Sequence, residues 1–198
     1  QLHITIHFDG GSRGNPGVAG AGAEVIIVNN NSTCTSDLIP ANSTSTTTYL
    51  TREYCGDRAT NNYAEYKGLL AGLKQAKICI EHSTKQSSTK SSPTNPLFLL
   101  QIYGDSNLVI QHLKGVWQCK HPNLKPLFHQ CQQIIGEMKK MDSNSEVLLE
   151  HIYREQNKVA DGKLHYEKML LVLNDAVGRS HLTTIITALA NEAMDRKE

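Results

Sequence analysis

The sequence predicts a single α/β domain in which a three-stranded antiparallel meander is followed by alternating helices and strands. The chain has 198 residues, which is enough for one such domain with a buried core. Its first part alternates apolar and polar side chains between turns rich in glycine, proline and asparagine, as the strands of a meander do. Further on, the nearly continuous apolar run LFLLQIYGDS at residues 97–106 is typical of a buried parallel strand.

The meander is expected in the first third of the chain. Residues 2–8 (LHITIHF) alternate strictly between apolar and polar side chains, as in a strand with one buried face. Residues 18–28 follow the turn GNPG as a second strand, and residues 49–54 form a third. The Ser/Thr/Asn-rich tract between the last two strands has little to bury, so it is expected to be a long mobile hairpin loop.

Helices and parallel strands are expected after the meander. Residues 61–76 carry apolar side chains at helical spacing and predict the first helix. A second polar tract leads to the buried strand at 97–106, which is followed by helices at 106–113 and 122–138 and by a last strand at 147–153. One or two further helices are expected in the tail.

Composition limits the kinds of partner and compartment. A net charge of +1 gives no strong global attraction for an anionic polymer, so any nucleic-acid binding has to come from local groups. The five cysteines are odd in number and form no CxxC motif, which is typical of free thiols in an intracellular protein. The sequence shows no signal peptide, transit peptide or transmembrane run, so no membrane contact is expected. Because it does not begin with Met, a targeting segment is not excluded.

The stretch FDGGSRGNPG at residues 8–17 has three interpretations. A phosphate-binding loop requires a strand, a glycine loop and then a helix, whereas here the glycines lead into another strand and no GKS or GKT follows. Two plain hairpin turns would explain Asn, Pro and Gly equally well. In the third interpretation Asp9 is a metal ligand, and the glycines let a nucleic-acid backbone come close.

Further carboxylates favour Asp9 as a metal ligand. Asp105 ends the buried strand, and if that strand is parallel to the first and beside it, the two aspartates project side by side. Glu65 lies one turn into the first predicted helix, and Asp161 follows the last strand. Such a cluster repels itself unless cations or protons neutralise it, and oxygen ligands without His or Cys suit Mg²⁺ or Mn²⁺. Two such ions about 4 Å apart clamp the attacking and leaving oxygens of a phosphodiester.

Four segments together resemble the type 1 ribonuclease H family in order and spacing: FDGGSRGNPGVAGAG, GDRATNNYAEYKGLLAGL, IYGDSNLVIQHLKGVW and REQNKVAD. The resemblance is to the compact form without a basic protrusion or a hybrid-binding domain, because KGVWQCKHPNLKPL leads straight into the next helix. It implies a ribonuclease H-like fold, with a five-stranded mixed sheet flanked by helices, in a single domain over residues 1–198.

The resemblance also implies an activity and a metal site. The family cuts the RNA strand of RNA–DNA hybrids internally and leaves 3′-hydroxyl and 5′-phosphate ends. Two Mg²⁺ ions, for which Mn²⁺ can substitute, would be held by Asp9, Glu65, Asp105 and, more peripherally, Asp161. The implied partner is the RNA–DNA hybrid, and the chain is expected to act as a monomer.

Substrate contacts are implied for a further set of residues. The three small residues after Asp9 would lie along the RNA strand, while Arg58 and Thr60 would hold a phosphate of the DNA strand. Asn61 and Thr60 compete as the helix N-cap, and Trp117 is equally well explained as a partly buried core residue. The implied substrate contacts are Gly10, Gly11, Ser12, Asn15, Arg58, Thr60, Asn61, Asn62, Asn107 and Trp117.

The chain departs from the family pattern in three places. The polar tracts at about 29–48 and 82–96 are insertions between elements, where they should be tolerated. Some members carry a His in the loop before the last Asp. Here that loop is REQN and His151 is expected in the preceding strand, so Arg154 or Glu155 takes that role or no residue does.

The third departure is the segment at residues 163–188, which separates VADG from ALANEAMD. It is either an additional helical hairpin or translated intron sequence. The alternative to an active nuclease is therefore a hybrid-binding protein that has lost catalysis because the insertion disturbs Asp161. A domain cut from a retroelement polyprotein is a third hypothesis, which the closeness to the compact cellular form disfavours.

Overall fold

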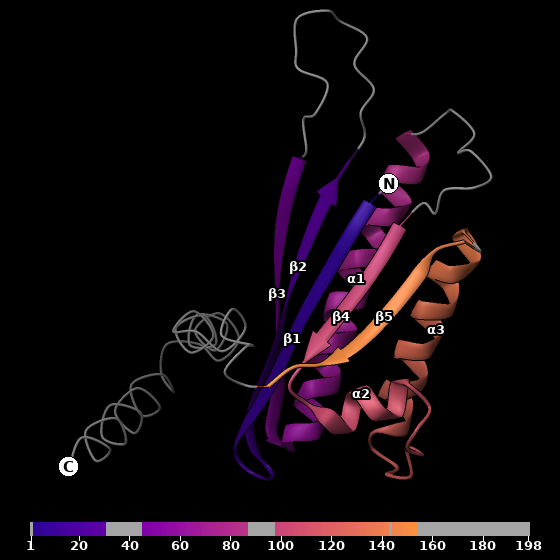
Figure 1. Cartoon of the computed structure of the whole chain (residues 1–198). Helices are drawn as coiled ribbons and strands as arrows, with labels where there is room; N and C mark the ends of the chain where they lie inside the picture. The colour runs from indigo at the N-terminus through magenta and orange to yellow at the C-terminus, as the bar shows by residue number, and fades with distance from the viewer. Residues whose placement is uncertain (1, 31–44, 87–97, 143, 154–198) are drawn as a thin grey trace, which may run out of the picture.

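The computed structural model describes residues 2–30, 45–86, 98–142 and 144–153. Within these ranges five strands form one mixed sheet in the order β3-β2-β1-β4-β5, with three helices packed against it (Figure 1). The predicted fold class is confirmed. The elements are β1 (Leu2–Gly14), β2 (Gly17–Asn29), β3 (Ser45–Ala59), α1 (Asn61–Gln86), β4 (Phe98–Gly104), α2 (Asn107–Leu113), α3 (Lys125–Met141) and β5 (Glu146–His151).

Strand β1 is shared by the two halves of the sheet. On one side it pairs antiparallel with β2, which pairs antiparallel with β3 and completes the meander. On the other side it pairs in parallel with β4, which pairs in parallel with β5. The carboxyl ends of the parallel strands therefore meet beside the middle of β1, and polar groups that follow those strands come together there.

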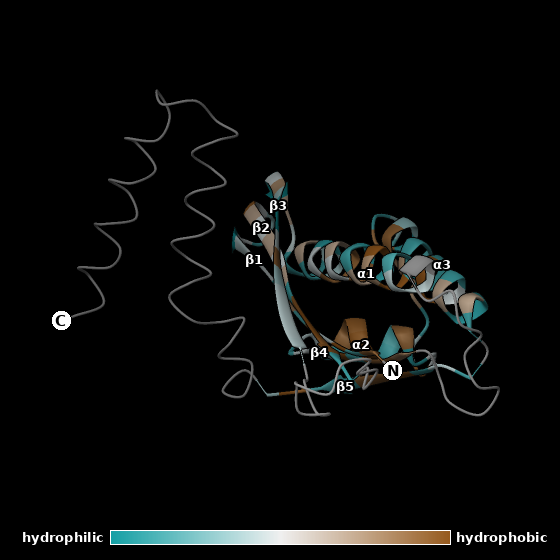
Figure 2. Ribbon diagram, turned by 90° about the horizontal axis from the view of Figure 1, so that it is seen from above, coloured by the Kyte–Doolittle hydropathy of each residue, from teal (hydrophilic) through white to brown (hydrophobic). Residues whose placement is uncertain are grey.

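The helices lie on one side of the twisted sheet and bury its apolar face (Figure 2). Leu2, Ile4, Ile6 and Phe8 alternate along β1 with polar residues and are almost fully buried, as the period of two predicts. Burial of each such side chain contributes about 1.5–3 kcal/mol. No helix in the described part of the chain is long and apolar enough to cross a membrane.

Several predicted boundaries were wrong. Strand β3 begins at Ser45 and α1 ends at Gln86, so parts of both polar tracts belong to regular elements. The early part of β3 pairs with β2 from Ser45 opposite Asn29 onward although its side chains are exposed. Helix α1 extends beyond its predicted end because Ile80 continues the buried stripe. Residues 31–44 and 87–97, and the helices expected in the tail, lie outside the described residues.

Strand β1 also continues to Gly14 instead of ending at Asp9, so the expectation that Asp9 closes the first strand was wrong. What ends near Asp9 is the parallel pairing, whose last pair is Phe8 with Gly104. The ring of Phe8 covers Gly104 so closely that a Cβ there would lie 2.2 Å from the ring carbon Cζ. Gly104 is therefore required by packing at the point where β4 ends.

This close contact predicts opposite effects of two Gly→Ala substitutions. Gly104→Ala is expected to lower the free energy of unfolding by about 1–3 kcal/mol, because the added methyl group collides with the ring of Phe8. Gly136→Ala in α3 is the matched control: no atom lies within 4 Å of its added Cβ, and alanine favours the helix by up to about 1 kcal/mol. Urea unfolding of both variants measures the difference, and equal effects would contradict the packing argument.

Candidate active site

Three carboxylates from three elements meet at the carboxyl end of the parallel strands. Asp9 comes from β1, Glu65 from α1, and Asp105 directly follows β4. Each offers one oxygen, and these oxygens lie within 4.8 Å of one another. Asp9 is 8% and Glu65 9% exposed, so water screens their charges weakly. The described residues contain no second group of three or more His, Cys, Asp or Glu in such an arrangement.

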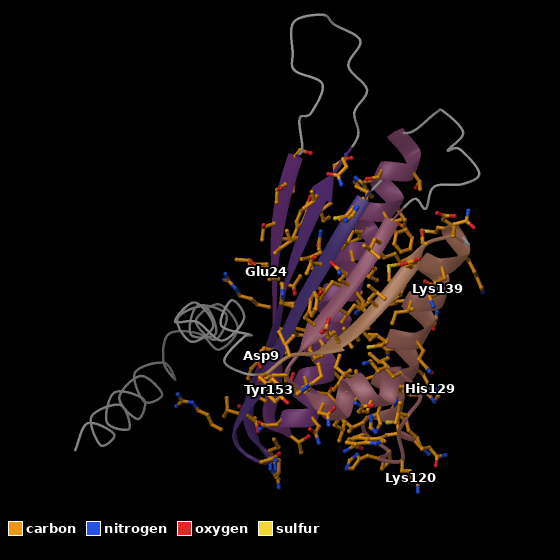
Figure 3. The ribbon with its side chains drawn as sticks, viewed as in Figure 1. Asp9, Glu24, Lys120, His129, Lys139 and Tyr153 are labelled. Atoms are coloured by element: carbon orange, nitrogen blue, oxygen red, sulfur yellow. The ribbon has the colours of Figure 1, made fainter. Side chains whose placement is uncertain are left out.

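The register of the parallel strands brings the two aspartates together. Phe8 of β1 pairs with Gly104 of β4, and Asp9 and Asp105 are the residues that follow this pair. Beyond this point β1 continues beside β2, while the backbone after β4 turns away into α2. Figure 3 shows Asp9 within β1, at the level where β4 and β5 end. The side-by-side placement predicted from the sequence thus has its origin in the parallel pairing.

Glu65 reaches the aspartates because the backbone of α1 lies directly on β1. A Cβ on Gly10 would lie 2.2 Å from the carbonyl carbon of Ala64 and 2.3 Å from the backbone nitrogen of Glu65. A Cβ on Gly68 would lie 2.6 Å from the backbone oxygen of Asp9. The side of Gly10 that a side chain would occupy is therefore filled by α1. No atom lies within 4 Å of a Cβ built on Gly11, so that position is open.

The start of α1 is joined to the β1–β2 hairpin by side-chain hydrogen bonds. The Asn61 oxygen Oδ1 accepts from the Ser12 N–H at 2.7 Å and from the Ser12 hydroxyl at 2.9 Å. The Asn61 N–H donates to Asn15 Oδ1 at 3.3 Å. Thr60 caps the helix, since its Oγ1 accepts the N–H of Tyr63 at 3.3 Å. Of the two competing caps, Thr60 is thus the one observed.

The other predicted substrate contacts lie around this hairpin and beyond α2. Arg58 is exposed near the end of β3, and Asn62 is exposed in the first turn of α1. Asn107 is the first residue of α2, and its Oδ1 accepts a hydrogen bond from the Gln111 amide at 3.1 Å. Trp117 lies in the connection between α2 and α3 and is 46% exposed, so its interpretation as a core residue was wrong.

Strand β5 supports the site from the other side. His151 ends β5, as expected, and its ring nitrogen Nε2 lies 3.1 Å from the backbone oxygen of Asp105. No sequence pattern indicates this contact, because it follows from the pairing of His151 with Gly104 in the parallel sheet. Asp161, Arg154 and Glu155 lie outside the described residues.

The described cysteines are free thiols, as expected. Burial raises the pKa of Cys55 and of Cys131 to about 12, so both stay protonated at neutral pH. A protonated thiol is a weak nucleophile, which leaves these two residues no role in covalent catalysis.

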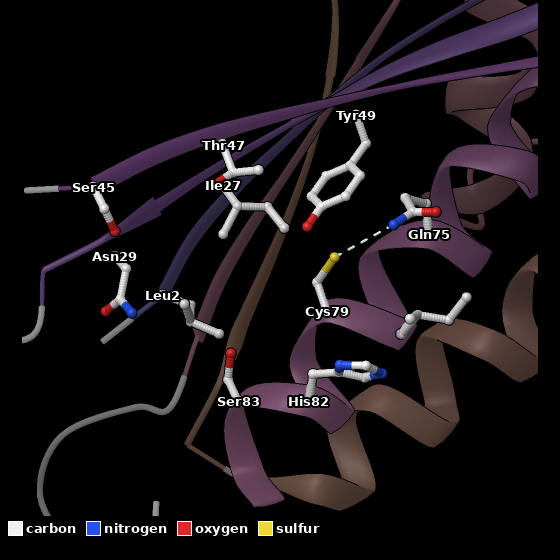
Figure 4. A pocket seen from close by; sticks show the side chains of 11 residues that line it. Leu2, Ile27, Asn29, Ser45, Thr47, Tyr49, Gln75, Cys79, His82 and Ser83 are labelled. Atoms are coloured by element: carbon white, nitrogen blue, oxygen red, sulfur yellow. Dashed lines mark hydrogen bonds between the residues drawn. The ribbon is translucent and has the colours of Figure 1, made fainter. Parts of the chain in front are cut away.

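A pocket of about 420 Å³ lies at the opposite end of the sheet (Figure 4). Its lining includes Leu2, Asn29, Tyr49 and Cys79, and the Gln75 amide donates to the sulfur of Cys79 at 3.5 Å. Leu2 and Asp9 are seven residues apart on one strand, which corresponds to roughly 23 Å. The pocket is therefore separate from the carboxylate cluster.

Comparison with known sequences gives one family match and several similar proteins. A family model described as "Reverse transcriptase-like" matches residues 98–163. The bifunctional protein Rv2228c of Mycobacterium tuberculosis is 32% identical over 160 residues, which is 81% of this chain and 34% of that protein. An uncharacterized protein of Mycobacterium bovis, Mb2253c, matches to the same extent. The chain thus spans about a third of the length of these curated relatives.

Solved structures extend the comparison to the fold. The N-terminal RNase H domain of Rv2228c, solved as a fusion with maltose-binding protein, is 30% identical with a TM-score of 0.54. The match covers 89% of this chain and 99% of that one. LC11-RNase H1, isolated from compost by a metagenomic approach, is 28% identical over 80% of this chain and 90% of its own, with a TM-score of 0.53. The same protein in complex with an RNA/DNA hybrid matches with a TM-score of 0.51 at 27% identity, over 80% of this chain and 91% of that one.

The contact between α1 and β1 predicts that adjacent glycines differ in their tolerance of a methyl group. Gly10→Ala is expected to lower the free energy of unfolding by about 1–3 kcal/mol, because backbone atoms of α1 occupy the place of the new Cβ. Gly11→Ala should change it by less than about 0.5 kcal/mol, because the space is open. Chemical unfolding of the two variants checks this, and a Gly10→Ala variant as stable as Gly11→Ala would contradict it.

Proposed function

This chain belongs to the type 1 ribonuclease H family, and we propose that it hydrolyses the RNA strand of RNA–DNA hybrids. The observation that carries the proposal is the convergence of Asp9, Glu65 and Asp105 at the end of the parallel strands. The reaction is proposed to be endonucleolytic and to leave 3′-hydroxyl and 5′-phosphate ends, as implied by the family. Asp161 is proposed as the fourth carboxylate of the site.

The carboxylates fit hard divalent cations. Three negatively charged groups with oxygens within 4.8 Å repel one another, and a cation removes that repulsion. The donor set contains no His or Cys, which favours Mg²⁺, with Mn²⁺ as a substitute. Two such ions would stabilise the charge that develops on the attacking and leaving oxygens of the phosphodiester. Asp9 and Asp105 are proposed to hold both ions, and Glu65 to hold one and to orient the attacking water.

The two strands of the hybrid are proposed to lie on opposite sides of the start of α1. Gly10, Gly11 and Ser12 are proposed to meet the RNA strand, because Gly11 leaves room for close approach and backbone groups can bond to 2′-hydroxyls. Because Asn61 uses its oxygen for Ser12, its amide N–H groups remain to donate to acceptors on the hybrid. Asn15 and Asn62 are proposed as neighbouring contacts.

Arg58 and Thr60 are proposed to hold a phosphate of the DNA strand. Arg58 is exposed, and its guanidinium matches the geometry of a phosphate. Thr60 accepts the N–H of Tyr63, which leaves its hydroxyl hydrogen to donate to a phosphate oxygen. Asn107 and Trp117 are proposed to contact the hybrid further along, since both are exposed.

Cleavage of a labelled RNA–DNA hybrid tests the proposed function. The chain is expected to cut the RNA strand in Mg²⁺ or Mn²⁺ and to leave duplex DNA and duplex RNA intact. Asp9→Asn should lower the rate by about a hundredfold or more, because the site loses a negative ligand. Asp161→Asn is tested beside it.

Glu146→Gln is the matched control, since it removes an exposed carboxylate at the far end of β5. Equal loss of activity in Glu146→Gln and Asp9→Asn would contradict the assignment of the site. Hybrid binding without cleavage in either metal would instead favour the alternative, a binding protein whose insertion at residues 163–188 has cost it catalysis.

The proposed contact of Arg58 with a phosphate of the DNA strand predicts a specific change in salt dependence. In an Asp9→Asn background, Arg58→Ala should weaken hybrid binding and reduce the slope of log K against log salt by about 1, because one phosphate contact is lost. Arg52→Ala is the control, since Arg52 is exposed on the same strand roughly 20 Å away. Fluorescence anisotropy at several salt concentrations measures the slopes, and an unchanged slope for Arg58→Ala would contradict its contact with a phosphate.

A further inference from the structure

Tyr66 carries a hydroxyl group into the hydrophobic core. It is the residue after Glu65 in α1, and it is 0% exposed. Burial is the largest cause of a raised pKa of Tyr66, and the nearby Cys119 and Cys131 raise this pKa further, so the phenol stays protonated. A buried hydroxyl without a partner destabilises a fold, and here the Tyr66 oxygen lies 2.8 Å from the ring nitrogen Nδ1 of His112.

His112 is itself buried, with 6% exposure, and burial lowers its pKa. The ring is therefore neutral at pH 7, and the Nδ1 of a neutral imidazole can accept a hydrogen bond from the phenol hydroxyl. Its ring stacks on Tyr66 with centroids 6.2 Å apart and meets Phe128 of α3 edge to face at 6.2 Å. One histidine thus contacts both long helices that pack on the sheet.

The hydrogen bond joins the two helices nearest to the carboxylates. Tyr66 adjoins Glu65 in α1, whereas His112 lies in α2, which begins two residues after Asp105. Glu65 is therefore one residue from the bond along α1, whereas Asp105 is connected to it through Ser106 and most of α2.

Helix α2 depends on tertiary contacts for its position. It has seven residues, which is too short to be stable alone, and its N-cap Ser106 makes no side-chain capping hydrogen bond. Its buried residues are Val109, Ile110 and His112. The two aliphatic side chains pack without directional preference, whereas the hydrogen bond of His112 prefers one distance and one angle.

We propose that Tyr66 and His112 form a positioning pair, which sets the placement of Asp105 relative to Glu65 and thereby the affinity of the carboxylates for divalent cations. The inference rests on the proposed function, because the cation site is what the pair would hold in shape. Neither residue is proposed to touch the substrate or the ions.

Calorimetric titration of the intact chain with Mn²⁺, without nucleic acid, tests the pair. Tyr66→Phe and His112→Leu are each expected to weaken Mn²⁺ binding by about tenfold. This is the low end of the loss of affinity that is usual when a residue that positions a metal ligand is removed. On the hybrid they should lower kcat, with KM changed by less than about twofold, because substrate contacts are retained. His112→Asn should keep affinity near that of the parent chain, since its Oδ1 can accept in place of Nδ1.

Ile80→Ala is the control for lost stability. Ile80 is fully buried in α1, 15 residues or roughly 22 Å from Glu65, so its truncation destabilises the core without touching the pair. Its Mn²⁺ affinity, measured well below the melting temperature, should equal that of the parent chain.

Three results would overturn the inference: unchanged Mn²⁺ affinity in both Tyr66→Phe and His112→Leu, an equal loss in Ile80→Ala, or no Mn²⁺ binding by the parent chain. A parent chain that binds Mn²⁺ but does not cut the hybrid would contradict the proposed function alone. The titration would then still decide the role of the pair.

Discussion

The arrangement of the described site depends on the contact between the backbones of α1 and β1 at Gly10 and Gly68. A side chain at either position would collide with backbone atoms, which cannot rotate away as a side chain can. The contact therefore permits one separation of helix and strand, and Glu65 and Asp9 are themselves part of it. Glycine at these two positions is the means by which a carboxylate on a helix reaches one on a strand.

Parallel pairing of β1 and β4 supplies the third carboxylate. The pairing of Phe8 with Gly104 fixes the register of the two strands. Asp9 and Asp105 are the residues that follow this pair. Three acidic groups held close together with little exposure oppose folding unless a cation or protons compensate. The apolar core beneath the sheet offsets this cost, since β1 alone contributes several fully buried side chains. The chain thus holds at one point charges that would otherwise separate.

The sequence predicted the order of elements, the mixed sheet and a cluster of four carboxylates, because periodicity and strand ends report which side chains are buried and where the chain turns. The described residues bring three of the four together, and Asp161 lies outside them. It could not show the start of β3, whose side chains are exposed and which is held by backbone pairing with β2. Nor could it show that α1 fills the space at Gly10, or that Asn61 bonds to Ser12 49 residues away. Such contacts depend on which distant segments become neighbours in the fold, and local sequence patterns do not indicate this.

The proposed function requires that Asp9, Glu65 and Asp105 form a site for divalent cations at the carboxyl end of the parallel strands. Anomalous diffraction from a crystal of this chain soaked in MnCl₂ tests it most directly. We expect an anomalous peak within bonding distance of Asp9 and Asp105, and the position of the peak would show whether Asp161 is also a ligand. A fully ordered cluster with no peak between the three carboxylates would contradict a cation site there.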